Sequence, residues 1–310
     1  MRDSMKQERI LITGSTGFVG KTLLTQLSKN YPISTVSHEE CDLEDLDQIY
    51  KVFKKHQPKI LINAAGSVAG IQGNLKNPVK LLETNSSIAL NIAKVAHELG
   101  VEHVIQFASA CIYPLNESTA SKPSDIGNGR IEETSKSYAM SKLLAIEIFS
   151  AYRKQFGHKW ITVIPSNLYG SGDWNHGTDG HVASMLLERF STASRNSKDT
   201  VGVWGDGQSL RNFLNVKDLA SAVEFIIENQ IWDQEVINVC GEPEITIEQL
   251  TRVIAKITDF KGQIEFDTTK PNGARRKMLD DSYLRSFGWK PKTGLEAGFS
   301  EYYESYLKNL

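Results

Sequence analysis

A turn with regularly spaced glycines near the start of the chain places the strongest constraint on the fold. The apolar run Ile10–Thr13 leads into residues 14–20, Gly-Ser-Thr-Gly-Phe-Val-Gly, and leucines at helical spacing follow. A strand, a Gly-x-x-Gly-x-x-Gly turn and a helix are typical of a dinucleotide-binding βαβ unit. Gly14 would permit the tight turn, Gly17 the approach of a pyrophosphate, and Gly20 the packing of helix on strand. The predicted cofactor contacts here are Gly14, Thr16, Gly17, Phe18, Val19 and Gly20.

Short apolar segments alternate with helical patterns over about the first 165 residues. The periodicity predicts further strands at residues 33–36, 59–63, 104–107 and 160–165, and helices from Asp42, over residues 79–99 and from Tyr138. Strands that alternate with helices form parallel sheets with right-handed crossovers. We therefore predict an α/β fold with a doubly wound parallel sheet of the Rossmann type and a smaller C-terminal substrate-binding α/β region.

The character of the sequence changes beyond Gly170. Residues 171–180 are rich in glycine and polar residues, which predicts a mobile loop, and Thr246 with Gln249 forms a capping box at the start of a helix. A further helix is expected at residues 182–190, and short strands at 201–204 and 213–216. We predict a dinucleotide-binding domain over residues 1–170, to which later segments can return, and a mainly substrate-binding region over residues 171–310.

Composition and charge narrow the class of protein. The 310 residues carry a formal net charge of −2, without the basic excess typical of nucleic-acid-binding proteins. Apolar runs are about as long as strands, far short of a membrane span, and residues 1–9 lack an apolar signal-peptide core. Cys41, Cys111 and Cys240 have the spacing neither of a disulfide framework nor of metal ligands. These features predict a cytoplasmic protein with no metal, nucleic-acid or membrane partner.

Four reactive side chains lie between the fourth predicted strand and the helix that follows it. Ser109 and Cys111 come just after the strand, and Tyr138 and Lys142 are four residues apart, so one helical face presents both. A phenol has an ordinary pKa of about 10, which a neighbouring ammonium is expected to lower. The Ser109 hydroxyl can hold a substrate oxygen on which negative charge develops. The group predicts a proton relay for carbonyl chemistry, with the thiol as a second acid or base.

The glycine turn, the serine and Tyr-x-x-x-Lys together resemble the short-chain dehydrogenase/reductase superfamily, in particular its extended, sugar-nucleotide branch. Over almost the whole chain, longer segments are similar to the GDP-L-fucose synthase family, of which GDP-colitose synthase is a relative. These segments include Ala-Ala-Gly at 64–66, Ser-Ala-Cys-Ile-Tyr-Pro at 109–114, Tyr-Ala-Met-Ser-Lys at 138–142, Gly-His-Val at 180–182 and Arg-Asn-Phe-Leu at 211–214.

The resemblance implies an NAD(P)H-dependent enzyme that epimerises C3 and C5 of a GDP-4-keto-6-deoxy-hexose and reduces C4, giving GDP-L-fucose or a close relative. Cys111 and His181 would exchange the protons beside the ketone, and Ser109 and Tyr138 would stabilise the enolate. Tyr138, supported by Lys142, would donate the proton for reduction. The implied substrate contacts are Ser109, Arg189, Trp204, Arg211, Lys277 and Asp280.

The resemblance also implies the remaining cofactor contacts. Family members usually place arginines in the glycine turn and after the second strand, against the 2′-phosphate of NADP, where this chain has Thr16, Ser37 and His38. NADP is the expected cofactor, and NAD stays open. A homodimer is expected through the helices at 79–99 and 138–156. Besides the turn, the cofactor contacts would be Ser37, His38, Asp42, Leu43, Ala64, Ala65, Tyr138, Lys142, Pro165, Asn167, Leu168 and His181.

Several other functions are considered. A nucleotide-sugar dehydratase or simple 4-epimerase is one alternative, but dehydratases typically carry an acidic pair where this chain has Ala110 and Cys111. A GDP-colitose synthase, an enzyme that only reduces or only epimerises, and a dinucleotide-binding regulator without turnover are others. Cys111 together with His181 argues against an enzyme that only reduces, and the complete pair of Tyr138 and Lys142 argues against a regulator.

Overall fold

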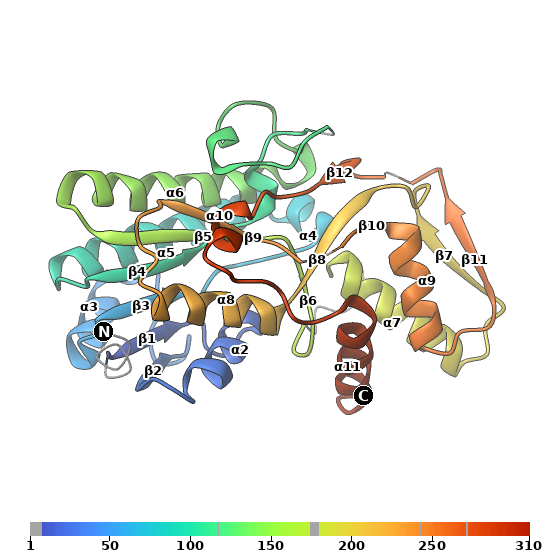
Figure 1. Ribbon diagram of the computed structural model, residues 1–310, viewed down its shortest axis with the longest axis horizontal. Coiled ribbons are helices and arrows are strands. Elements are labelled where there is room, and N and C mark those ends of the chain that lie inside the picture. The colour runs from blue at the N-terminus through green and yellow to red at the C-terminus, as the bar shows by residue number, and fades with distance from the viewer. Residues whose placement is uncertain (1–7, 117, 174–179, 242, 271) are drawn as a thin grey trace.

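A parallel sheet of six strands organises the larger part of the computed structural model, which describes residues 8–116, 118–173, 180–241, 243–270 and 272–310 (Figure 1). The strand order is β2-β1-β3-β4-β5-β9, and all neighbours pair in parallel. The strands are β1 (Ile10–Thr13), β2 (Ile33–Val36), β3 (Ile60–Asn63), β4 (His103–Phe107), β5 (Lys159–Pro165) and β9 (Val236–Val239). The predicted doubly wound α/β fold is confirmed.

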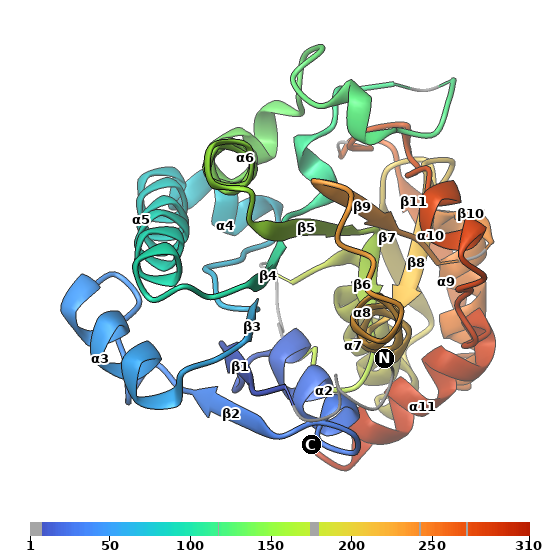
Figure 2. The ribbon, with the colours of Figure 1, turned by 60° about the vertical axis from the view of Figure 1, so that its left-hand side comes forward.

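Helices cover both faces of this sheet (Figure 2). Ile12 packs in one hydrophobic core with Leu23, whereas its neighbour Leu11 packs in a second core with Phe149. Successive side chains of a strand point to opposite faces, so a strand covered on both sides is apolar throughout. One face carries α2 (Phe18–Leu27) and α8 (Val216–Glu228), and the other carries α3 (Leu46–His56), α5 (Pro78–Glu98) and α6 (Lys136–Phe156).

A smaller layer lies beyond the carboxyl ends of these strands, on the right of Figure 1. Its centre is β8 (Leu210–Asn215), which pairs with β6, β10 and β12, and a separate pair is formed by β7 and β11. The layer also contains β6 (Asn167–Tyr169), α7 (Val182–Arg195), β7 (Thr200–Trp204), β10 (Glu244–Thr246), α9 (Ile247–Ile257), β11 (Gln263–Asp267), β12 (Arg276–Lys277) and α11 (Leu295–Leu307). The two remaining helices belong to the larger part: α10 (Ser282–Ser286) packs against β9, and α4 (Ile71–Lys76) against α5.

The structure refines several expected boundaries. The helix expected from Asp42 begins at Leu46, because the Asp45 side chain accepts hydrogen bonds from the N–H groups of residues 47 and 48. Val216 begins α8 rather than ending a strand, and the expected capping box of Thr246 is present. Both α8 and β9, from the C-terminal half, lie with the large sheet. Of the loop expected at 171–180, residues 174–179 lie outside the described part.

Among the helices that the structure describes, none has the length and apolar character needed to cross a bilayer.

Candidate active site

The four predicted reactive side chains meet at the carboxyl end of β4. Ser109 precedes the short 3-10 helix Ala110–Ile112, which holds Cys111, and Tyr138 and Lys142 lie in the first two turns of α6. The Lys142 ammonium lies 5.6 Å from the centroid of the Tyr138 ring and donates to the Phe107 carbonyl at 3.5 Å. Hydrogen bonding with Ser109 lowers the pKa of both the Tyr138 phenol and the Cys111 thiol, against the effect of burial. The site thus combines a hydroxyl, a thiol, a phenol and an ammonium.

Burial dominates the protonation of the two α6 side chains. It raises the pKa of Tyr138 above its ordinary value, with the nearby Cys111 adding to the rise and the hydrogen bond to Ser109 opposing it. It lowers the pKa of Lys142 to about 8. The expectation that the lysine charge brings the pKa of Tyr138 down is therefore wrong for this structure, because desolvation of the phenolate is the largest effect on that pKa and raises it. A neutral phenol is suited to give a proton away.

The Cys111 thiol is also held in its neutral form. Burial raises its pKa, while the Ser109 hydrogen bond and the charges of Lys277 and Lys142 oppose the rise. Cys111 lines a small cavity together with Glu132 and Lys277. The other two cysteines are buried in hydrophobic cores. Cys111 is thus the cysteine placed for chemistry.

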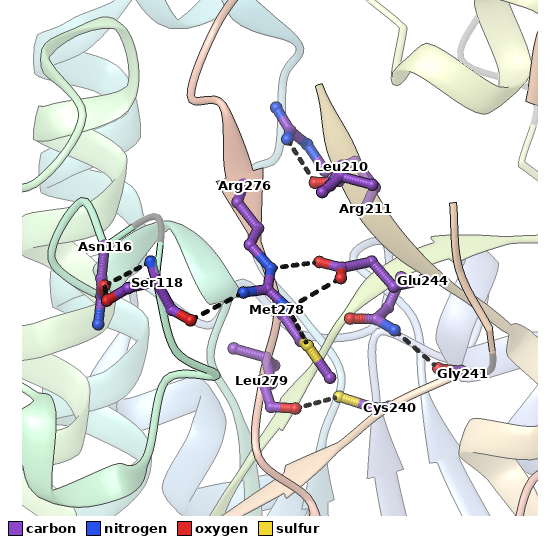
Figure 3. A network of polar contacts seen from close by, with 11 residues as sticks. Asn116, Ser118, Leu210, Arg211, Cys240, Gly241, Glu244, Arg276, Met278 and Leu279 are labelled. Carbon is purple, nitrogen blue, oxygen red and sulfur yellow. Dashed lines mark hydrogen bonds and ion pairs between the residues drawn. The ribbon is translucent and has the colours of Figure 1, made fainter. Parts of the chain in front are cut away.

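The strand β12 reaches this cavity from the C-terminal half of the chain, and Figure 3 shows how it is fixed. The Arg276 guanidinium donates to both carboxylate oxygens of Glu244, at 2.8 and 2.9 Å, and to the Ser118 carbonyl at 3.0 Å. Cys240, just after β9, donates its S–H to the Leu279 carbonyl at 3.1 Å. These contacts place Lys277 beside Cys111.

Three of the predicted substrate residues have partners near this strand. Arg211 of β8 donates to the carbonyls of residues 210 and 274, both at 2.7 Å. The Lys277 ammonium lies 2.5 Å from the carboxylate of Glu132. The Asp280 carboxylate accepts from the N–H of Ser282 at 2.9 Å and lies 4.0 Å from the Lys122 ammonium.

The remaining predicted residues lie on α7 and β7. Arg189 donates to the Gly202 carbonyl at 2.6 Å, which joins α7 to the strand that ends at Trp204. The Trp204 side chain is 43% exposed, so it is not a core residue. His181 is the N-cap of α7 and is exposed, and no described residue links its imidazole by a hydrogen bond to the cluster at Cys111.

The glycine turn forms a cradle at the carboxyl end of β1. Gly14 has a φ of +68°, and a Cβ there would lie 2.6 Å from the backbone nitrogen of Ala65. A Cβ on Gly20 would lie 2.1 Å from the Gly14 carbonyl oxygen. Gly17 is the N-cap of α2 and leaves the first turn without a side-chain cap or an acidic residue. The free N–H groups of this helix terminus suit an anionic pyrophosphate, so these residues fit a dinucleotide.

The other predicted cofactor residues follow β2, β3 and β5. The N–H of Ser37 donates to the Glu40 carboxylate at 2.8 Å, which leaves His38 at the exposed tip of the turn after β2. Asp42 and the buried Leu43 come next. Ala64 and Ala65 follow β3, Pro165 ends β5, and Asn167 and Leu168 begin β6.

Sequence reasoning missed two features of the site. One is Glu132, which no motif distinguishes. The other is a buried chain of hydrogen bonds across three strand ends: Thr13 donates to Asn63 at 2.6 Å, Asn63 to Gln106 at 2.7 Å, and Gln106 to the Phe107 carbonyl at 3.0 Å. That carbonyl also accepts from Lys142. This series of hydrogen bonds therefore links β1, the strand before the glycine turn, to Lys142. Its only signal in the sequence is the polar residues at the ends of apolar strands.

Sequence and structure comparisons relate the chain to enzymes that act on nucleotide sugars. Residues 10–240 match the model of the NAD dependent epimerase/dehydratase family. The chain is 35% identical to GDP-L-fucose synthase 1 of Arabidopsis thaliana, over 99% of this chain and 95% of the relative. It is 34% identical to GDP-L-colitose synthase of Yersinia pseudotuberculosis, over 96% and 98%. A solved structure, MlghC, a GDP-mannoheptose C4 reductase from Campylobacter jejuni with NADP bound, is 25% identical with a TM-score of 0.86, over 97% and 99%.

The chain belongs to the NAD dependent epimerase/dehydratase family, within which it groups with the GDP-L-fucose and GDP-L-colitose synthases. The predicted resemblance is thereby confirmed, and the protein is an NAD(P)-dependent sugar epimerase/reductase.

Proposed function

We propose that the protein catalyses the NAD(P)H-dependent 3,5-epimerisation and 4-keto reduction of a GDP-4-keto-6-deoxy-hexose, with GDP-L-fucose or a close relative as product. The observation that carries this proposal is the Cys111 thiol beside Ser109, Tyr138 and Lys142. A reductase needs only the last three, whereas a thiol beside them supplies an acid or base for C–H exchange. The relatives named GDP-L-fucose synthase and GDP-L-colitose synthase support the same substrate class.

The proposed mechanism starts with the ketone oxygen held by Ser109 and Tyr138. Charge that moves onto this oxygen acidifies the C–H bonds at C3 and C5, where Cys111 and His181 exchange protons. When bound, the reduced nicotinamide supplies hydride to C4. Tyr138 gives its proton to the C4 oxygen, and the charged Lys142 beside the ring stabilises the phenolate that remains.

Basic and aromatic side chains would hold the nucleotide part of the substrate. Arg211 and Arg189 are suited to the diphosphate, because a guanidinium donates two parallel hydrogen bonds to such a group. Lys277 borders the thiol cavity, so it can contact the substrate close to Cys111. The exposed indole of Trp204 can cover a ring face, and Asp280 is proposed on the nucleotide side.

For the cofactor, we propose NADPH bound across the Gly14–Gly20 cradle, with Thr16, Ser37 and His38 at the ribose. The NADP in the MlghC structure supports this choice. The ratio of kcat/KM for NADPH and NADH measures the preference, and a ratio well below one would reverse it. We also propose that the enzyme works in the cytoplasm.

The decisive experiment incubates the protein with GDP-4-keto-6-deoxy-mannose and NADPH or NADH in deuterated water. We expect oxidation of the cofactor, deuterium at C3 and C5, and GDP-L-fucose as product. A substrate that lacks the 3-hydroxyl, run in parallel, distinguishes a GDP-colitose synthase. Reduction without deuterium uptake would instead identify an enzyme that only reduces, and cofactor binding without turnover of either sugar would identify a regulator.

Two variants assign the roles. Cys111→Ser is expected to lose most of the deuterium uptake and to keep cofactor binding. Tyr138→Phe is expected to lose hydride transfer by roughly 10²-fold or more, the usual contribution of a positioned acid. Unchanged uptake in the first variant, or appreciable reduction in the second, would contradict the assigned role.

A further inference from the structure

A largely buried ion pair, whose side chains keep some exposure, borders the thiol cavity and joins two distant parts of the chain. Glu132 immediately precedes the 3-10 helix Glu133–Ser135 that leads into α6, and Lys277 lies on β12. Their charged atoms lie 2.5 Å apart, and the two side chains are only 15% and 23% exposed. Both residues line the same cavity as Cys111. The pair is therefore a fixed feature of the thiol's surroundings.

The Glu132 carboxyl group is ionised near neutral pH. Burial by itself would raise the pKa of Glu132, but Lys277 overcomes this effect and holds the pKa below its usual range. A buried pair adds little to stability compared with apolar side chains of the same volume. Its position beside a reactive group therefore calls for an explanation other than folding.

Several titratable side chains act on Cys111 or line the cavity beside it in the described part of the structure. Lys142 and Tyr138 face it from α6, and Glu132 and Lys277 from the other side. Arg276 also borders the cavity, but its charge is neutralised by Glu244.

The charge of Arg211 lowers the pKa of Glu132. Both side chains approach Gly273, where an added Cβ would lie 3.7 Å from the Arg211 guanidinium and 3.7 Å from the Glu132 carboxylate. The Glu132 carboxylate acts on Cys111 in the opposite direction to the two lysines and raises the pKa of the thiol.

We propose that Glu132 is a positioning residue, which holds and neutralises Lys277 beside Cys111 so that the ion pair sets the acid–base balance of the thiol. A group that must both take and return a proton works best with its two forms close in free energy. Lys277 without its partner would favour the thiolate, and Glu132 without Lys277 would favour the thiol. The role in C3/C5 exchange rests on the proposed function, but the effect on Cys111 ionisation does not.

The test measures the ionisation of Cys111 without substrate or cofactor. Thiolate ultraviolet absorbance is followed against pH for each variant, and the curve of the same variant carrying Cys111→Ser is subtracted. We expect Glu132→Gln to lower the Cys111 midpoint and Lys277→Met to raise it, each by about one pH unit, the size expected for one charge acting over several ångströms. The double variant is expected to return close to the wild-type midpoint.

Glu133→Gln is the matched control, because Glu133 is the next residue and its side chain is 65% exposed and paired with Lys136. Its midpoint should equal that of the wild type. Shifts in the same direction for Glu132→Gln and Lys277→Met, or shifts no larger than that of the control, would overturn the proposal. If Glu132→Gln does not fold, as judged by circular dichroism, the Lys277→Met midpoint decides alone, and an unchanged value overturns it.

The activity arm separates this inference from the proposed function. With substrate, the pH profile of deuterium uptake should move in the same direction as the thiol midpoint in each variant, while the NADPH dissociation constant stays the same. Opposite thiol shifts in a protein that does not turn over GDP-4-keto sugars would refute the proposed function and leave the inference standing. Normal turnover with no thiol shift would refute the inference alone.

Discussion

Lys142 illustrates, at the scale of a residue, how a functional side chain opposes folding. It is 6% exposed, and burial lowers its pKa from 10.5 to about 8. Between these two pH values the unfolded chain holds a proton that the folded protein has lost, so stability rises with pH across that window. Below about pH 8 the folded protein bears the full penalty of a buried charge.

Replacement of Lys142 by Met should therefore stabilise the protein while abolishing reduction. We expect the free energy of unfolding at neutral pH to rise by about 1 to 3 kcal/mol, since each pKa unit corresponds to about 1.4 kcal/mol. The gain should disappear above about pH 10.5, where the lysine is neutral in both states. Chemical denaturation at several pH values measures this, and a Met variant less stable than the wild type at neutral pH would contradict it.

At the scale of an element, the glycine turn depends on close backbone contact. Gly20→Ala would place a Cβ 2.1 Å from the Gly14 carbonyl oxygen, so α2 must move away from β1. We expect a loss of about 1 to 3 kcal/mol in stability and a weakening of dinucleotide binding by roughly tenfold or more, the equivalent of about 1.4 kcal/mol. Thermal unfolding and a fluorescence titration with NADPH measure the two effects.

The control for this variant is Gly294→Ala. Gly294 is the N-cap of α11 and has no atom within 4 Å of an added Cβ. Its stability should change by less than about 1 kcal/mol, with unchanged NADPH affinity. Equal effects of the two variants would show that the turn is not the dinucleotide cradle.

The attachment of the 276–280 segment depends on Asn238, at the end of β9. Its side chain accepts from the Tyr113 hydroxyl at 2.7 Å and donates to the carbonyls of Ser121 and Asp280, both at 3.0 Å. Asn238→Ala removes these three hydrogen bonds and leaves the buried Tyr113 hydroxyl without its acceptor, whereas the Ser121 carbonyl still accepts from the Asp280 N–H at 2.8 Å. We expect a loss of about 1 to 3 kcal/mol. The KM for the sugar nucleotide should rise more than the KM for the cofactor. Asn309→Ala, at an exposed asparagine, is the control and should leave both the stability and the two KM values unchanged.

At the scale of the molecule, an exposed apolar face on α5 and α6 favours a homodimer. Residues at helical spacing form it: Val79, Leu82 and Leu90 on α5, and Met140 and Leu144 on α6, with exposed fractions of 38–63%. We propose that two copies pair through this face. The double variant Leu90→Glu with Leu144→Glu should be a monomer by light scattering, because each dimer would bury four unpaired carboxylates.

Leu307→Glu on α11 is the control, since Leu307 is 43% exposed, close to the 45% of Leu144, but lies outside this face. It should leave the mass unchanged. A monomeric wild type, or a double variant that keeps the mass of the wild type, would refute pairing through α5 and α6.

Local patterns in the sequence determined much of this protein. The alternation of apolar segments with helical periodicity predicted the parallel sheet, because buried strands and amphipathic helices have different spacings. The glycine turn and the four-residue step from Tyr138 to Lys142 depend only on neighbouring residues, so their geometry could be predicted. The start of α7 directly after His181 could be predicted in the same way. A joint role of His181 with Cys111 stays a prediction.

Only the tertiary structure decided the features that depend on distant residues and on burial. Glu132 meets Lys277 across 145 positions of the chain, and no periodicity reports such a contact. The return of β9 to the sheet brings Asn238 and Cys240 to the segment that carries Lys277. The pKa of Tyr138 follows desolvation, which is set by everything packed around the ring rather than by the lysine one turn away.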